Sequence, residues 1–339
     1  MSTANNVRTR STISYCVLPT IRPERMVAFF DAWNGGYLSD NFVLVEDNPT
    51  KSDFSKVPED FRKNHYAWDD IDRICGKHAW IFSRRDSAIR AFGFLVAWHK
   101  GAQSVLTVDD DVYPHAGFEN LYYHHVKNRS TQTRWVPSAG VRTRGLPYRN
   151  LGHLKDVHAS VGLWTEAGDP DAIEALTKIA RGDAEPFQPS PGVRLVPHGQ
   201  YVPVCGMNLF FSKAALPFFY FPLMGEGQPY RRMDDIFCGI LAKKMFDHLG
   251  WHMVVGEPFV VHSRASDPFV NLVKEAPGIA ANETFWEAVD AVKLTNTEPI
   301  KVVRDMGSGL VGHKDPYIAN LGKALGVWAD LLATKPAGL

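Results

Sequence analysis

Short apolar runs alternate with segments of helical spacing through the first half of the chain. In most of these runs nearly every side chain is apolar, so neither side of the predicted strand is polar. Strands of this kind are typical of a mostly parallel sheet that is covered on both faces. The predicted strands lie at residues 14–20, 41–49, 79–85 and 104–108.

Helices are predicted where apolar residues recur every three or four positions. Residues 86–98 have this spacing, with Asp86 in the position of the N-cap. The spacing recurs at 233–250 and at 316–333, and the latter helix is expected to pack on its own domain rather than on a partner subunit. Residues 253–263 predict short strands. Together these patterns predict an α/β fold, a mostly parallel sheet flanked by helices in a single large domain.

The composition argues against several classes of function. Lys plus Arg and Asp plus Glu number 37 each in 339 residues, and a net charge of zero does not favour nucleic acid or an anionic membrane as partner. We expect no membrane span, because no apolar run reaches about 18 residues. The polar N-terminus does not resemble a secretory signal. Four widely spaced cysteines without a C-x-x-C pair predict reduced, mostly buried thiols in a cytoplasmic protein.

Three adjacent carboxylates, Asp109, Asp110 and Asp111, follow directly after the strand at 104–108. Alternation along a strand would place Asp109 and Asp111 on one side and Asp110 on the other. Two such charges about 7 Å apart repel by roughly 2–3 kcal/mol at an effective dielectric constant of about 20. The cluster therefore favours a cation, and oxygen ligands favour Mg²⁺ or Mn²⁺, which also bind substrate phosphates. The alternative is a solvated acidic turn.

A divalent ion at this place suits the cleavage of a nucleotide sugar. Such an ion stabilises the charge that develops on the departing diphosphate, and nearby arginines add to the effect. Residues 120–155 contain no Asp or Glu but seven Lys or Arg. This segment is either a source of such arginines or a basic surface loop.

Several long motifs follow one another in the order found in one known family. They are VLPTIRPERMVAFFDAW, WDDIDRICG, DSAIRAFGFLVA, LTVDDDVYP, VCGMNLFF, PLMGEGQPYRRMDDIFCG and VVHSRASDPFVNL, with DPYIANLGKALGVWAD near the C-terminus. In these motifs the chain resembles the reversibly glycosylated polypeptides, the UDP-arabinopyranose mutases of plants. The resemblance implies a Rossmann-like fold of the GT-A glycosyltransferase type and a bound Mn²⁺ or Mg²⁺. It also implies interconversion of the pyranose and furanose forms of UDP-arabinose, and glycosylation of an arginine.

The family's motifs assign roles to particular residues. Asp109, Asp110 and Asp111 match its triple aspartate, which implies that Asp109 and Asp111 bind the metal and that Asp109 and Asp110 contact the nucleotide sugar. The segment RGLPY matches the motif of the modified arginine and places that arginine at Arg144. Arg149 is the nearest match for a second functional arginine.

Four residues of the second half complete the candidate metal and sugar site. His262 follows a strand and is expected to be a third metal ligand; the alternative is a hydrogen-bonded core histidine. Asp234 and Asp235 open a helix and are both catalytic candidates. We expect Asp234 to cap the helix and Asp235 to contact the sugar or to act as a base near C1. Asn208 is expected to reach the site.

The ends of the first strands provide the candidates for nucleotide binding. Ligands of open α/β sheets bind beyond the carboxyl ends of the strands. Thr20, Arg22 and Asp47 lie at such ends and are expected near the base and the ribose. Asp86 and Arg90 are four residues apart on one helix, so they either pair with each other or, as the family implies, contact the uridine and the diphosphate.

These expectations give a domain plan and three competing functions. Residues 1–13 would be a flexible arm, 14–300 a GT-A-like nucleotide-sugar domain, and 301–339 a helical segment packed on the domain or on a partner subunit. The expected function is a UDP-arabinose mutase, in which Arg144 either takes the sugar covalently or only stabilises charge. The alternatives are a metal-dependent glycosyltransferase using UDP-arabinose, UDP-glucose or UDP-galactose, and a non-enzymatic subunit. A homo-oligomer is expected because family members associate.

Overall fold

The apolar runs of the first half form the parallel part of one sheet. The computed structural model describes residues 13–136, 144–183, 186–263 and 267–339. In this part of the chain β1 pairs in parallel with both β2 and β4, and β2 pairs in parallel with β3. The order β3-β2-β1-β4 is Rossmann-like: strands are added on one side of β1 as far as β3, and β4 is then added on the other side of β1. The bounds are β1 (Ser14–Thr20), β2 (Phe42–Glu46), β3 (His65–Tyr66) and β4 (Ser104–Val108).

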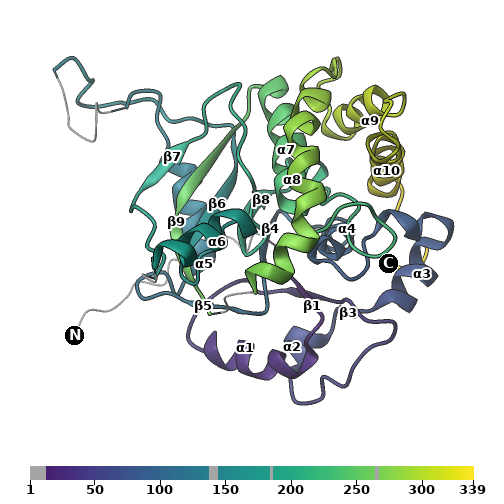
Figure 1. The fold of residues 1–339 in the computed structure, drawn as a ribbon. Helices are drawn as coiled ribbons and strands as arrows, with labels where there is room; N and C mark the ends of the chain where they lie inside the picture. The colour runs from purple at the N-terminus through teal and green to yellow at the C-terminus, as the bar shows by residue number, and fades with distance from the viewer. Residues whose placement is uncertain (1–12, 137–143, 184–185, 264–266) are drawn as a thin grey trace.

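The second half extends the same sheet with strands of both directions. β8 is antiparallel to β4, and β6 is antiparallel to β8 but parallel to β9. β5 and β7 both pair with β9 in antiparallel fashion. The full order is β3-β2-β1-β4-β8-β6-β9-β5, with β7 on β9 (Figure 1). The bounds are β5 (Val112–Pro114), β6 (Val157–Glu166), β7 (Val193–Leu195), β8 (Asn208–Ser212) and β9 (His252–His262).

Helices cover both faces of the sheet, which explains why its strands lack a polar side. Cys16 and Leu18 belong to a buried cluster on one face, which includes residues of α1 and which α2 packs against; Val17 belongs to the cluster on the other face, which includes residues of α3, α4, α7, α9 and α10. The predicted α/β class is confirmed. The helices are α1 (Met26–Ala32), α2 (Glu59–Arg62), α3 (Trp68–Cys75), α4 (Arg90–His99), α5 (Leu121–Ser130), α6 (Ala172–Arg181), α7 (Asp234–Leu249), α8 (Pro268–Asp290), α9 (Pro299–Leu310) and α10 (Pro316–Ala333), with short 3-10 helices η1 (Pro23–Arg25), η2 (Gly76–Ile81), η3 (Ser87–Ile89) and η4 (Leu216–Phe218).

One predicted strand is wrong and one predicted set of short strands is a single long strand. Residues 79–85 form the end of η2 and a loop. Ile81 and Phe82 are buried there in the core cluster, where Phe82 meets Phe92 of α4 edge to face. Residues 253–263 lie almost wholly in the eleven-residue strand β9.

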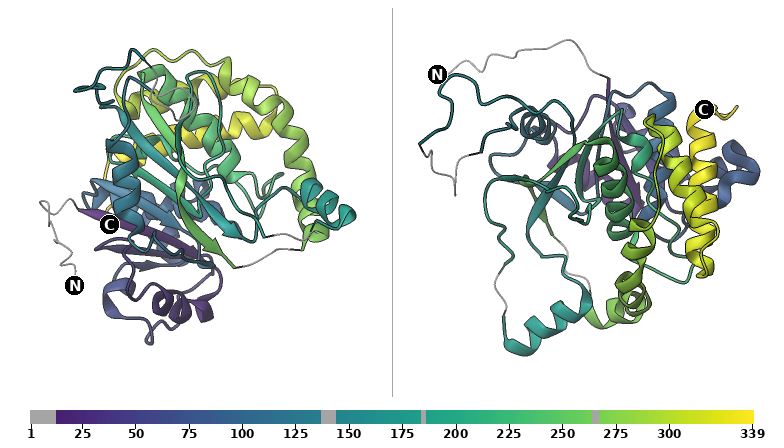
Figure 2. Two further views of the ribbon diagram at one scale, coloured as in Figure 1. Left: turned by 90° about the vertical axis from the view of Figure 1, so that its left-hand side faces the viewer. Right: turned by 90° about the horizontal axis from the view of Figure 1, so that it is seen from above.

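The C-terminal helices pack on the body of their own chain. The indole of Trp328 in α10 donates to the carbonyl of Pro217, and the indole of Trp98 in α4 donates to the carbonyl of Leu332. Residues 316–333 therefore contact their own chain, as expected from the sequence. α6 lies beside the N-terminal part of α8, at some distance from the sheet (Figure 2). None of the helices in the described ranges is long and apolar enough to cross a bilayer.

The four cysteines behave as their spacing predicts. Cys16, Cys75, Cys205 and Cys238 are all buried free thiols. Burial raises the pKa of each thiol, so each stays protonated near neutral pH.

Candidate active site

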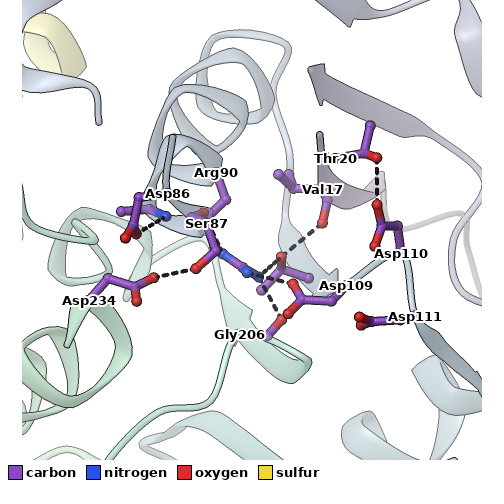
Figure 3. Close-up of polar contacts among 12 residues, drawn as sticks. Val17, Thr20, Asp86, Ser87, Arg90, Asp109, Asp110, Asp111, Gly206 and Asp234 are labelled. Atoms are coloured by element: carbon purple, nitrogen blue, oxygen red, sulfur yellow. Dashed lines mark hydrogen bonds and ion pairs between the residues drawn. The ribbon is translucent and has the colours of Figure 1, made fainter. Parts of the chain in front are cut away.

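Two arginines neutralise the three aspartates that follow β4. Arg90 pairs with Asp109 at 2.5 Å, whereas Arg22 pairs with both Asp110 and Asp111, the latter at 2.9 Å. The hydroxyl of Thr20 donates to Asp110 at 2.5 Å (Figure 3). Because β4 ends at Val108, the expected alternation does not continue, and the prediction that Asp110 faces away from Asp111 is wrong.

Arg90 is held rigidly although it is almost fully buried. Its side chain is 1% exposed and donates to the hydroxyl of Thr107, the carbonyl of Gly206 and the carbonyl of Ser87. The hydroxyl of Thr107 is itself fixed by a bond to the carbonyl of Val17 in β1 (Figure 3). The alternative in which Arg90 pairs with Asp86 is therefore wrong, and the guanidinium is a fixed positive charge beside Asp109.

Gly206 allows the backbone to approach Arg90 closely. A Cβ atom at this position would overlap the guanidinium of Arg90, which would have to leave the carbonyl that it now contacts. We expect Gly206→Ala to lower kcat/KM by about 10- to 100-fold, because a misplaced charged group near the reacting atoms has effects of this size. Steady-state kinetics of the variant checks this. Gly312→Ala is the stability control, since this exposed glycine does not have a positive φ and a Cβ atom there would lie in open space.

Asp47 fixes the turn that precedes α4. Its two carboxylate oxygens accept hydrogen bonds from the indole of Trp68 and from the backbone amides of Arg85 and Asp86, at 2.8–2.9 Å. Arg85 adopts a φ of 59°, a conformation that these bonds help to hold. The carboxylate is thus turned toward the protein, so the expected contact with the base or ribose would require it to leave these partners.

Half-buried Asp86, which precedes η3, and buried Asp234, the first residue of α7, form an acidic pair (Figure 3). Asp86 caps η3, as predicted, by accepting from the amide of Ala88. Burial and the neighbouring charge of Asp234 raise the pKa of Asp86 to about 8. Burial raises the pKa of Asp234 as well, although Arg90 and the hydroxyl of Ser87, which donates at 2.8 Å, oppose this. The pair therefore retains a proton near neutral pH.

The start of α7 differs from the prediction. Asp234 is the first residue of the helix, and Met233 has the cap position without a side-chain bond. Asp234 is therefore not the cap; its carboxylate is directed to Ser87 instead. Asp235 accepts from the amide of Ile236, and burial together with Asp234 raises its pKa well above the ordinary value.

Asp169 and Arg232 belong to the same charged region but were not predicted. Arg232 lies 3.5 Å from Asp169 and donates to Glu275 at 2.7 Å. Burial raises the pKa of Asp169, while the charges of Arg232 and His262 lower it. Arg232 stands two residues before Asp234 in a motif already singled out, which was a usable signal. No local pattern marks Asp169.

His262 lies next to the aspartates, at the end of β9. Val112 is its partner in the register of β5, and the carbonyl of Asp111 accepts from the amide of Ser263 at 3.3 Å. Nδ1 of His262 contacts the carbonyl oxygen of Ala167 at 2.8 Å, which orients the ring and leaves Nε2 as the nitrogen for a ligand.

The donor set suits a divalent cation in its chemistry. Aspartates outnumber arginines around the end of β4, and one oriented imidazole accompanies them. Among the described residues, no three His, Cys, Asp or Glu side chains are already gathered as a metal site. Arg22 and Arg90 instead neutralise the carboxylates, so a cation would have to share these oxygens with the two guanidinium groups.

Three other candidates do not contact the carboxylates of this cluster, although Asn208 pairs with Val108 in the sheet. Asn208 uses its carboxamide within the sheet, with Oδ1 on His125 and Nδ2 on the carbonyls of Leu163 and Pro258. The side chain of Asn208 would have to give up these hydrogen bonds to contact the sugar as expected. Arg144 and Arg149 are exposed in the loop before β6, and neither forms an ion pair or hydrogen bond with Asp109, Asp110 or Asp111.

The sequence matches one family over most of its length. The profile of the family described as "Reversibly glycosylated polypeptide" matches residues 14–335. "Probable UDP-arabinopyranose mutase 1" of Zea mays is 34% identical over 336 residues, covering 93% of this chain and 88% of the maize protein. "UDP-arabinopyranose mutase 1" of Arabidopsis thaliana is 34% identical and covers 93% and 90%. That of Oryza sativa subsp. japonica is 33% identical and covers 93% and 88%.

A solved structure with a distant likeness was also found. It is glucosyl-3-phosphoglycerate synthase from Mycobacterium tuberculosis in complex with Mn²⁺, UDP and glucosyl-3-phosphoglycerate. It is 13% identical with a TM-score of 0.42, and the match covers 90% of this chain and 82% of that one.

Proposed function

The chain belongs to the reversibly glycosylated polypeptide family, and on that premise we propose that it is a UDP-arabinopyranose mutase that interconverts UDP-arabinopyranose and UDP-arabinofuranose. The names of its relatives suggest the activity. The observation that carries the proposal is the convergence of Asp109, Asp110 and Asp111 with Arg22 and Arg90 at the carboxyl ends of β1 and β4. This edge of an α/β sheet is where ligands bind.

The two arginines have complementary roles toward the diphosphate. Arg22 is the more accessible, with 22% of its side chain exposed, and it can donate to a phosphate oxygen while it keeps Asp110. Arg90 is fixed and supplies positive charge from behind Asp109. Charge that is already in place where the departing diphosphate becomes more negative lowers the barrier to C1–O cleavage.

A divalent cation, Mn²⁺ or Mg²⁺, would be held by the carboxylates of Asp109 and Asp111 and by Nε2 of His262. When bound, it supplies further positive charge to the departing diphosphate. Asp110 is the most strongly engaged of the three aspartates, since it binds both Thr20 and Arg22. Asp110 therefore positions Arg22 rather than binding the ion.

The change of ring size moves one proton but consumes none, and the bond between C1 and UDP that breaks at the start re-forms at the end. The bond between C1 and the old ring oxygen breaks, a bond from another hydroxyl oxygen to C1 forms, and the proton of that hydroxyl passes to the old ring oxygen. Two neighbouring carboxyl groups, of which one is protonated and one is ionised, can act as base for the hydroxyl that attacks C1 and as acid for the old ring oxygen. Asp86 and Asp234 have this property, and Asp235 is the adjacent carboxyl that we propose contacts the sugar hydroxyls.

A second candidate function is a metal-dependent glycosyltransferase that uses a UDP-sugar donor and modifies itself. The exposure of Arg144 favours it, because an acceptor side chain must be accessible. A guanidinium is a poor nucleophile because it stays protonated, so attack on C1 would require a strong base nearby. The structure brings no carboxylate of the Asp109–Asp111 cluster to Arg144.

The test is to incubate the purified protein with each isomer of UDP-arabinose, with Mn²⁺ or with EDTA, and to separate both isomers and free UDP by chromatography. Metal-dependent interconversion without net release of UDP is the expected result. Release of UDP with a gain of mass on the protein, and no interconversion, would contradict the mutase and support the glycosyltransferase.

Replacing Asp111 by Asn tests the proposed cation ligand. We expect kcat/KM to fall by about 100-fold, the size of effect seen when one charge-stabilising group is lost. We also expect the affinity for UDP to fall in Mn²⁺ but to change little in EDTA, which calorimetry measures. Asp31→Asn, on the exposed side of α1, is the matched control. Equal loss of UDP affinity with and without Mn²⁺ contradicts the role of Asp111 as a metal ligand.

A further inference from the structure

A second pocket lies at the opposite end of β4 from the candidate active site. It has a volume of about 460 Å³ and lies where β4 begins, between Trp98, Arg129, His158, Ser212, Lys213 and Pro217. This volume is in the range of pockets that bind small molecules. Five strand residues separate the start of β4 from Asp109, a distance of about 17 Å at about 3.3 Å per residue. The pocket is therefore separate from the site at Asp109–Asp111.

Arg129 brings a half-buried charge to this pocket. Its Nε donates to the carbonyl of Val157 at 2.7 Å, and its guanidinium lies 5.3 Å from the ring centre of Phe210. Within the described residues no carboxylate lies at ion-pair distance from this guanidinium, in contrast to Arg22 and Arg90. Burial lowers the pKa of Arg129 to about 10, which still leaves it charged at neutral pH. A charge that is partly removed from water and has no counter-charge costs free energy unless a ligand compensates it.

Lys213 is a second cation in the same pocket. Its Nζ lies 5.7 Å from the ring centre of Trp98, and in the described ranges it has no carboxylate at ion-pair distance. The one acidic residue that lines the pocket is Glu298, which is exposed and lies 3.7 Å from Lys301. The local charge around Arg129 and Lys213 is therefore positive, although the chain as a whole has no net charge.

The remaining walls are aromatic, apolar or neutral. Nδ1 of His158 contacts the hydroxyl of Ser212 at 2.8 Å, and its ring packs on Trp251 with centres 4.1 Å apart. Burial lowers the pKa of His158 to about 4, so the ring is neutral and adds no third charge. Trp98 and Pro217 provide apolar surface. This combination suits a ligand with a small anionic group and a compact body.

We propose that this pocket binds a small phosphorylated metabolite of the size of a pentose phosphate, with its phosphate between Arg129 and Lys213 and its sugar against Trp98. A phosphate satisfies both cations, because several oxygens are available to separate donors. The flat face of an indole suits the body of a sugar, and the hydroxyl of Ser212 and the ring of His158 are polar groups for its hydroxyls. None of the residues that line this pocket belongs to the proposed UDP-sugar site.

Ribose 5-phosphate is the probe for this proposal. It is titrated by calorimetry into the full chain, alone and again with UDP and Mn²⁺ present. We expect a dissociation constant of about 0.1–1 mM that UDP does not change. Unphosphorylated ribose is expected to give no binding in this range, and inorganic phosphate weaker binding, because each lacks one part of the recognised ligand.

Variants assign the binding to the two cations. Arg129→Met and Lys213→Met are each expected to weaken binding at least about 10-fold. Lys127→Met, an exposed position on the same helix, is expected to leave it unchanged. Lys213→Met keeps the test decisive if Arg129→Met unfolds, which the thermal midpoint reports. The proposal is wrong if ribose 5-phosphate shows no binding up to about 10 mM, if UDP competes with it, or if Lys213→Met binds it as tightly as the unmodified chain.

Discussion

Replacing Arg90 by Met is expected to lower kcat/KM for UDP-arabinopyranose by about 1,000-fold, the largest effect of a single substitution that we foresee. Arg90 is the only charge partner that the described residues offer to Asp109, and it is fixed by Thr107, Gly206 and Ser87. Methionine fills a similar volume but removes the charge. Loss of one such preorganised group costs about 100- to 1,000-fold in enzymes that stabilise a developing anion.

The same substitution also leaves Asp109 without its counter-charge, which is expected to weaken UDP binding because two anionic groups then face each other. Steady-state kinetics, UDP affinity and the thermal midpoint should be measured on one preparation. Arg90→Lys keeps the charge but not the fork of donors, so it should recover part of kcat/KM. Arg73→Met is the matched control, because that side chain is 63% exposed. A kcat/KM within about threefold of the unmodified value would remove Arg90 from the proposed mechanism.

Elements with a strong periodic pattern could be predicted from the sequence. β1 was predicted at its observed bounds, and so were β4 and α10. These segments are apolar on every side or amphipathic over several turns, so local pattern and burial agree. The strand predicted at residues 79–85 was wrong because local pattern and burial do not agree there. Ile81 and Phe82 are apolar because they fill the space beside α4, and burial alone does not determine a strand.

The location of the candidate site was predictable, but its pairings were not. Chain order and strand direction require Thr20, Asp47 and Asp109 to reach the same edge of the sheet. Which arginine meets which aspartate depends on turns after the strands. Arg90 pairs with Asp109 and not with Asp86, because the turn that Asp47 holds directs the side chain of Asp86 toward α7. Sequence proximity therefore does not predict which charged residues pair when tertiary contacts determine the pairing.

The acidic pair of Asp86 and Asp234 is expected to make the protein less stable as the pH rises from about 6 to about 8. The native state holds the proton of Asp86 up to a pKa of about 8, whereas the unfolded chain releases it near the ordinary carboxyl value. Between these values the unfolded state binds fewer protons, so the free energy of unfolding falls with rising pH. We expect a loss of about 2 kcal/mol over this interval, since one pKa unit corresponds to about 1.4 kcal/mol.

Asp86→Asn should remove the part of this dependence that Asp86 contributes, because asparagine can still accept from the amide of Ala88 but does not ionise. The variant is then expected to be more stable than the unmodified protein at about pH 8 and similar to it only near about pH 4, where the carboxyl of the unfolded chain is also protonated. Urea unfolding at several pH values measures this, and Asp60→Asn, with an 87% exposed side chain, should keep the original slope. If the pair also moves the proton of ring exchange, Asp86→Asn lowers kcat by about 100-fold or more. If the slope of the free energy of unfolding against pH is unchanged, Asp86 does not hold the proton. If this slope is lost but kcat is unchanged, the pair has only a structural role.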